Sequence, residues 1–159
     1  MTYDSVYTDR YKQPSKSGEA YDLSLANRFE LAIFELEREV LQRLFRRLRG
    51  ADPGTRYLDF ACGTGRIVGV FQDAIRTKLG VDTSLGQLTV ARQKIPDAEF
   101  VHGNLVTDPG LLRHRQFDLI TSFRLLLHLE PENRVLVLRA LREHLAPDGY
   151  LVADNHMNR

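Results

Sequence analysis

The chain has 159 residues, of which 43% are hydrophobic and 27% are charged, a balance typical of a single globular domain. Its 22 basic and 21 acidic residues give a net charge of +1, which argues against a dedicated nucleic-acid binder. No apolar run approaches the roughly 20 residues that span a bilayer, and the first residues lack the features of a signal peptide, so no membrane association is expected. A single cysteine, Cys62, cannot form an internal disulfide, so a cytoplasmic location is expected.

The N-terminal residues are polar and interrupted by Pro14 and Gly18, which predicts a flexible arm over 1–20 and one folded domain over 21–159. Apolar residues then recur at spacings of three and four, which predicts a long helix with one apolar stripe. The stripe consists of Leu25, Phe29, Ile33, Leu36, Val40, Leu44 and Leu48. Gly50 ends this helix. The arginines of its last turns complement the helix dipole without requiring an anionic ligand.

Beyond Gly54, short apolar runs alternate with helical patterns. The runs predict strands over residues 56–60, 78–82, 99–102, 117–122 and 150–153. The first helix between them is expected to carry Ile67, Val70, Phe71 and Ala74.

The next helix carries Leu88, Ala91 and Ile95, with Ser84 as its cap. The last helix is predicted over 131–145, with one apolar side that consists of Val135, Leu138, Leu141 and Leu145. Residues 105–116 are too short and too broken for a full helix, and Pro147-Asp148-Gly149 is expected to form a turn before the last strand.

Strands that alternate with helices imply right-handed parallel crossovers. The predicted fold is therefore α/β, a Rossmann-like, open, mainly parallel doubly wound sheet of about five strands with flanking helices. Ligands of such sheets bind beyond the carboxyl ends of the strands, where the strand order reverses.

A glycine-rich segment, Asp59-Phe60-Ala61-Cys62-Gly63-Thr64-Gly65, begins at the end of the first predicted strand and continues beyond it as a loop. Its glycines allow a sharp turn and close approach of a ligand, and the N–H groups that open the next helix favour an anion. A dinucleotide fingerprint would require a third glycine where Val68 stands, and a P-loop would require Lys-Ser/Thr after Gly65. Neither nucleotide motif is therefore satisfied.

Acidic and amide residues follow the first three predicted strands. Asp59 beside the glycine loop suits an ammonium group better than a pyrophosphate, so a zwitterionic amino acid such as the head group of S-adenosylmethionine fits both the carboxylate and the loop. Asp82 ends the second strand and can accept hydrogen bonds from both ribose hydroxyls. Asn104 follows the third strand and offers a donor and an acceptor to an adenine edge.

Five segments, in this order and spacing, resemble the class I S-adenosylmethionine-dependent methyltransferases, with matches over roughly residues 21–155. They are the glycine loop, in which Ala61 replaces a frequent glycine; Gly80-Val81-Asp82; His102-Gly103-Asn104, in which Asn104 replaces a common aspartate; 117–124; and Leu145-Ala146-Pro147-Asp148-Gly149. The resemblance implies the class I fold and the cofactor S-adenosylmethionine.

The resemblance also implies contacts to the cofactor. The residues that would hold its methionine part are Asp59, Ala61, Cys62, Gly63 and Gly65. Those that would hold its ribose and adenine are Asp82, Thr83, Gln87, Asn104 and the backbone of Leu105. Phe123 and Arg124 would lie beside the sulfonium, and Tyr11 or Tyr21 is a candidate lid with a cation–π contact.

No catalytic residue is identified. His128 and His156 are candidate general bases for an acceptor hydroxyl, whereas His102, His114 and His144 are expected at the surface. Cys62 is expected to fill space rather than act as a nucleophile, and no metal site is indicated.

The sulfonium of the cofactor is already an activated methyl donor, so the protein has to align the acceptor and exclude water. A small-molecule acceptor is expected, and both O- and N-methylation stay open. Members of the family continue past the fifth strand with a helix and a β-hairpin that this chain lacks. The fifth strand would thus be an open edge, which is expected either in a truncated chain or natural fragment, or in an assembly in which a second copy or a partner chain covers the edge. The alternatives are a catalytically inactive S-adenosylmethionine-binding module that acts through a partner, and a nicotinamide-linked oxidoreductase, which Asp59 and Val68 disfavour.

Overall fold

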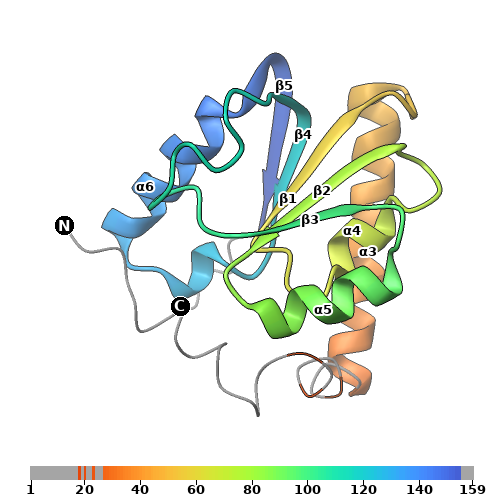
Figure 1. Cartoon of the computed structure of the whole chain (residues 1–159). Helices are drawn as coiled ribbons and strands as arrows, with labels where there is room; N and C mark the ends of the chain where they lie inside the picture. Colours follow the sequence, from red (N-terminus) through yellow and green to blue (C-terminus); the bar gives the residue numbers. More distant parts are fainter. Residues whose placement is uncertain (1–17, 19, 21–22, 24–26, 155–159) are drawn as a thin grey trace.

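The computed structural model describes residues 18, 20, 23 and 27–154 (Figure 1). Its centre is a sheet of five parallel strands in the order β3-β2-β1-β4-β5. The strands are β1 (Arg56–Phe60), β2 (Thr77–Asp82), β3 (Glu99–His102), β4 (Phe117–Ser122) and β5 (Leu145–Ala153). The predicted open, doubly wound α/β sheet is confirmed.

The helices of the described chain precede or connect these strands. They are α3 (Arg28–Arg49), α4 (Arg66–Val70), α5 (Leu85–Lys94), the short 3-10 helix η2 (Leu126–His128) and α6 (Pro131–Glu143). Asn27 caps α3 by accepting a hydrogen bond from the Glu30 N–H, and Gly50 ends this helix in the left-handed conformation. Ser84 caps α5 as predicted, through the Gln87 N–H. None of the described helices is both long and apolar enough to cross a bilayer.

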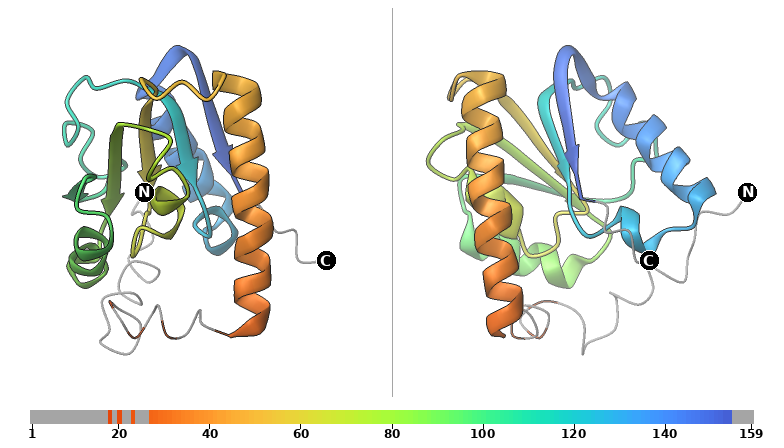
Figure 2. Two further views of the ribbon diagram at one scale, coloured as in Figure 1. Left: turned by 90° about the vertical axis from the view of Figure 1, so that its right-hand side faces the viewer. Right: turned by 180° about the vertical axis from the view of Figure 1, so that it is seen from behind.

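The helices cover the two faces of the sheet (Figure 2). On one face, Leu41 and Phe45 of α3 pack in a core together with residues of α4 and α5. On the other face, Val137 and Leu141 of α6 pack against strand residues and against the loop that follows β3. The sheet is therefore the middle of three layers, as expected for parallel strands that are buried on both sides.

The sheet order places the topological switch point at β1. The chain runs outward from β1 through β2 to β3 and then returns to the other side of β1 as β4. Consequently the loops that follow β1 and β4 diverge at the carboxyl edge of the sheet and leave room for a ligand between them.

Four predicted elements have different bounds, of which two differ slightly: α6 ends at Glu143, two residues early, and β2 begins at Thr77, one residue early. The helix that was expected to carry Phe71 and Ala74 ends at Val70, because the N–H groups of both residues bond three positions back and the chain tightens into turns. Strand β5 begins at Leu145, earlier than predicted, because residues 147–149 form an irregularity in its pairing with β4 rather than a separate turn.

The predicted apolar stripe of the first helix is partly wrong. Phe29, Leu36 and Val40 of α3 are 71%, 64% and 54% exposed, whereas Leu41 and Phe45 are buried. The helix has apolar residues on two faces, and periodicity alone does not tell which face meets the sheet.

The apolar side predicted for the last helix is also partly wrong. In α6, Val135 and Leu138 are exposed, while Val137 and Leu141 form the buried contact. As in α3, apolar residues lie on more than one face of α6, and only one of these faces packs against the sheet.

Candidate functional site

The main cavity of the described chain lies at the carboxyl edge of the sheet, at the switch point. Most of the residues that the sequence singles out line it: Asp59, Ala61, Cys62, Gly63, Asp82, Thr83, Gln87, Asn104, Phe123 and Arg124. The structure thus brings together side chains that are separated by up to 65 positions in the sequence.

The glycine loop between β1 and α4 turns sharply over the end of β2. Ala61, Gly63 and Gly65 all have positive φ, at 61°, 56° and 79°. The Cys62 N–H donates to the Val81 carbonyl at 3.1 Å. A Cβ at Gly63 would lie 2.6 Å from the Gln87 Oε1, a contact that this flexible side chain can relieve by moving, so the positive φ is what favours glycine there.

Asp59 lies at the end of β1 and is 1% exposed. Its Oδ1 accepts a hydrogen bond of 2.6 Å from the Thr121 hydroxyl, which lies 2.6 Å from the buried Tyr57 hydroxyl. Its Oδ2 is buried and has no hydrogen-bond partner among the residues that the structure describes. Burial, reinforced by the negative charge of Asp82, raises the pKa of Asp59 to about 7, although the Thr121 hydrogen bond and the Arg66 charge oppose this shift.

An unsatisfied buried carboxylate oxygen is costly unless a ligand completes it. The missing partner is a hydrogen-bond donor, and a cationic donor would also favour the ionised form. An ammonium group meets both demands.

Asp82, at the end of β2, accepts hydrogen bonds from the glycine loop and from the loop that precedes α5. Its Oδ2 accepts from the Gly63 N–H at 2.8 Å, and its Oδ1 accepts from the Ser84 N–H at 2.8 Å. Burial raises the pKa of Asp82, and these N–H groups act against the shift. A carboxylate has about four lone-pair directions, so each oxygen can still accept a hydrogen bond from a ribose hydroxyl.

Asn104 follows β3 and is mostly buried. Its Oδ1 accepts from the Val106 N–H at 3.0 Å, which forms a local turn. The group that this side chain can offer a ligand is therefore the amide N–H₂ donor rather than the oxygen.

Two of the residues predicted at the site do not line the cavity. Gly65 packs α4 against α5, since a Cβ there would lie 3.0 Å from Ile95 and 3.3 Å from Ala91. The Leu105 side chain is 1% exposed and belongs to the core on the α6 face.

Sequence reasoning missed several lining residues, which are Phe60, Thr64, Arg66, Ile67, Val81, Gly103 and Leu125. Most of them are direct chain neighbours of predicted ones, so adjacency is the signal that could have found them. Arg66 also directly follows a predicted residue, Gly65, but no local signal shows that its side chain pairs with Glu37 of the distant helix α3.

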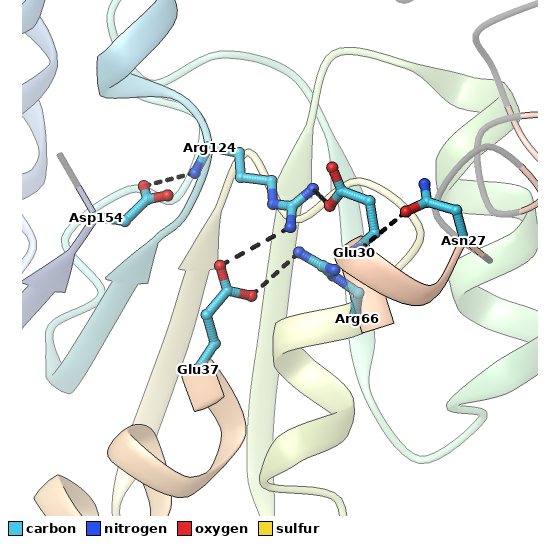
Figure 3. A network of polar contacts seen from close by, with 6 residues as sticks. All are labelled: Asn27, Glu30, Glu37, Arg66, Arg124 and Asp154. Atoms are coloured by element: carbon cyan, nitrogen blue, oxygen red, sulfur yellow. Dashed lines mark hydrogen bonds and ion pairs between the residues drawn. The ribbon is translucent and has the colours of Figure 1, made fainter. Parts of the chain in front are cut away.

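The loop that follows β4 carries Phe123 and Arg124. Arg124 has a positive φ of 59°, and its N–H donates to the Asp154 Oδ1 at 2.6 Å. Its side chain reaches α3, where it forms an ion pair with Glu30 (Figure 3). The end of β4, the residue after β5 and α3 are thus joined beside the cavity.

None of the described histidines lines this cavity. His128 in η2 is exposed. His102 and His114 are exposed as predicted, but the prediction for His144 is wrong, because this ring is buried and its Nδ1 lies 2.9 Å from the Arg115 carbonyl. The candidate lid residues Tyr11 and Tyr21, the candidate base His156 and most of the predicted arm lie outside the described residues.

Cys62 is buried in the core on the α3 face, and burial raises the pKa of its thiol well above the usual value. The protonated thiol is therefore favoured, which agrees with the expectation that this residue fills space rather than acting as a nucleophile. Among the described residues no group of histidine, cysteine and carboxylate side chains could hold a metal ion.

The fold and the site define a class I S-adenosylmethionine-dependent methyltransferase: a parallel sheet with this switch point, a glycine loop after β1 and an acidic residue at the end of each of the first two strands. Comparison with known proteins agrees. A family model described as "Methyltransferase domain" matches residues 58–149, more than half of the chain. The chain belongs to this family.

Two curated relatives have different acceptors in their names. A demethylmenaquinone methyltransferase from Renibacterium salmoninarum is 37% identical over 107 residues, which are 65% of this chain and 42% of that protein. A dTDP-3-amino-3,6-dideoxy-alpha-D-glucopyranose N,N-dimethyltransferase from Streptomyces fradiae is 32% identical over 108 residues, which are 67% of this chain and 41% of that protein. The chain thus spans less than half the length of these relatives.

A solved structure with bound cofactor is also similar. It is an amino pentose methyltransferase from Micromonospora echinaspora, determined with S-adenosylmethionine, and it superposes with a TM-score of 0.62 at 26% identity. The match covers 96% of this chain and 57% of that one.

Proposed function

We propose that this chain binds S-adenosylmethionine in the cavity at the switch point and transfers its methyl group to the nitrogen of a small-molecule acceptor. One observation carries the proposal. The Asp59 Oδ2 is buried and has no partner in the described part of the chain, and Asp59 lines the cavity, where the methionine ammonium of this cofactor would supply the missing donor.

The other lining residues fit the remaining parts of the cofactor. Asp82 is placed to accept the ribose hydroxyls, and the Asn104 amide to donate to an adenine ring nitrogen. The backbone of Ala61 and Gly63 allows close approach of the amino-acid part. The cofactor contacts of the predicted residues are part of this proposal, Gly65 and Leu105 acting through the backbone and packing around the cavity.

The bound cofactor supplies a methyl group on a positively charged sulfur that needs no further activation. The chain has to hold the acceptor in line and keep water out. The loop residues Phe123 and Leu125, which line the cavity after β4, supply apolar wall on the side where an acceptor would enter.

Nitrogen is the preferred acceptor because the described cavity wall contains no histidine, lysine or tyrosine, and its two carboxylates, Asp59 and Asp82, are assigned to the ammonium and the ribose of the cofactor. A neutral amine has its lone pair available without deprotonation, whereas a hydroxyl needs a base. The names of the dTDP-amino-sugar and amino pentose relatives agree with an amino sugar as the acceptor class.

The test is a methyl-transfer assay with labelled S-adenosylmethionine and three acceptors: a nucleotide-linked amino sugar, the same sugar with a hydroxyl in place of the amine, and demethylmenaquinol. Transfer to the amine alone is expected. Transfer to the hydroxyl or to the quinol ring would contradict the choice of nitrogen, and cofactor binding without any transfer would favour the binding-module alternative.

We also propose that a second copy or a partner chain covers the open edge of β5. Within the described chain, β5 pairs only with β4, and an unpaired strand edge is a template for association. The exposed apolar residues of α3 add to this tendency. Light scattering at increasing concentration should show association, and a monomer throughout would contradict it.

The lone cysteine supports a reducing, cytoplasmic setting for this domain.

A further inference from the structure

Four charged side chains form a compact network between α3 and the cavity (Figure 3). The Arg124 Nη1 lies 2.6 Å from the Glu30 Oε2, and the Arg124 Nη2 lies 3.9 Å from the Glu37 Oε1. The Arg66 Nη2 donates to the Glu37 Oε2 at 3.2 Å. Between 10% and 25% of each side chain is exposed, so water screens these pairs only in part.

The two arginines belong to the cavity and the two glutamates do not. Arg66 and Arg124 line the cavity, whereas Glu30 and Glu37 stand behind them on α3. Arg66 also stacks on Phe34 of α3, with its guanidinium carbon 4.8 Å from the ring centre. Besides the carboxylates of Asp59 and Asp82, the cavity wall therefore carries two guanidinium groups, each of which pairs with a glutamate of α3.

We infer that Glu30 and Glu37 are positioning residues that set the charge preference of the cofactor site, by cancelling the two guanidinium charges at its wall. This inference rests on the proposed function. S-adenosylmethionine has a net charge of +1, from an ammonium, a carboxylate and a sulfonium, whereas the product S-adenosylhomocysteine has a neutral sulfur and no net charge. Two uncancelled arginines would oppose the substrate cofactor and leave the product almost unaffected.

The predicted sign does not depend on the exact pose of the cofactor, because only the net charges differ between the two compounds. Removing one carboxylate makes the charge beside the cavity more positive by one unit. At separations of about 10 Å and an effective dielectric constant of about 40, Coulomb's law gives a roughly three- to five-fold loss of affinity for a ligand of charge +1. The effect should shrink as salt is added.

The experiment is calorimetric titration of the full chain with each compound, at pH 7.5 and low salt, for wild type and Glu37→Gln. The ratio of the two dissociation constants is the readout, because a merely structural loss would weaken both compounds alike. The matched control is Glu35→Gln, on the same helix, whose carboxylate pairs with Arg38 at the exposed surface. It should leave the ratio unchanged.

A neutral pair provides the second test. In the double variant Glu37→Gln/Arg66→Gln both charges are gone, so the ratio should return to within about two-fold of wild type even if both affinities fall. Thermal melts establish that each variant is folded, and Glu30→Gln serves in its place if Glu37→Gln does not fold.

Each outcome is decisive. A three- to five-fold fall in the preference for S-adenosylmethionine in Glu37→Gln, absent in Glu35→Gln and reversed in the double variant, supports the inference. Equal losses for both compounds, or a ratio that the double variant does not restore, overturn it. Failure of the wild type to bind either compound would instead remove the proposed function.

Discussion

The ionised form of Asp59 lowers the stability of the ligand-free protein but favours the binding of an ammonium group. Its pKa is raised to about 7, so in the ligand-free protein its ionised form is disfavoured by burial. A carboxyl group whose folded pKa exceeds its unfolded value contributes stability that is complete below the unfolded pKa, near 4, and is lost as the pH rises through 7. The ammonium of a bound cofactor would reverse this preference by pairing with the charged form.

We therefore expect Asp59→Asn to stabilise the ligand-free chain at pH 8, by about a few degrees in Tm, and to stabilise it clearly less at pH 5, where the folded carboxyl is still protonated. The amide is neutral at both pH values and can still accept the Thr121 hydrogen bond. Thermal melts at the two pH values measure this difference. A lower Tm for the variant at pH 8 would contradict the raised pKa.

The affinity of the wild type for S-adenosylhomocysteine should rise about five- to ten-fold between pH 6 and pH 7.5, as Asp59 ionises in the ligand-free protein. The ligand ammonium remains largely protonated over this range. Titrations across the range provide the measurement, and an affinity that is flat with pH would show that Asp59 does not meet the ammonium.

Ala61 stands in the left-handed region, with a φ of 61°, where an alanine pays a steric cost that glycine does not. Ala61→Gly should therefore keep the fold and raise the free energy of unfolding by up to about 1 kcal/mol, whereas β-branched Ala61→Val should lower it by at least as much. Denaturant unfolding distinguishes the two. Equal effects of both substitutions would rule out backbone strain as the cause.

At the scale of elements, the buried face of α3 is expected to contribute more to the free energy of unfolding than its exposed face. Leu41 is 2% exposed and Leu36 is 64% exposed, although both belong to apolar rows of the same helix. Leu41→Ala should cost about 3 kcal/mol of unfolding free energy, since it leaves a cavity against the sheet. Leu36→Ala is the matched control and should cost no more than about 0.5 kcal/mol. Similar costs for the two would contradict the described orientation of α3.

Sequence reasoning predicts the parallel sheet and most of the site for a physical reason. Strand periodicity and the residues at strand ends, such as Asp59 and Asp82, are local signals, and parallel topology brings such ends to one edge. The orientation of α3, the burial of His144 and the reach of Arg66 to Glu37 depend on tertiary packing between distant segments. No local pattern contains that information.

At the scale of the whole molecule, the proposed cofactor site is assembled from both halves of the sheet. The loops after β1, β2 and β3 supply one wall, and the loop after β4, tied to Asp154 and α3, supplies the other. A ligand that bridges these loops should stabilise the chain as a unit. At a concentration one hundred times its dissociation constant, S-adenosylhomocysteine should add about 2.7 kcal/mol, or roughly 5–10 °C in Tm. NAD at the same concentration is the control and should produce no shift.

The central claim is that the unsatisfied Asp59 carboxylate at the switch point receives the ammonium of an adenosyl amino acid. Titration calorimetry of S-adenosylhomocysteine into wild type and Asp59→Asn at pH 7.5 tests it most directly. We expect saturable binding at one site per chain in the wild type, weakened at least about ten-fold in the variant. An absence of binding heat in the wild type, or equal affinities for the two proteins, would contradict the claim.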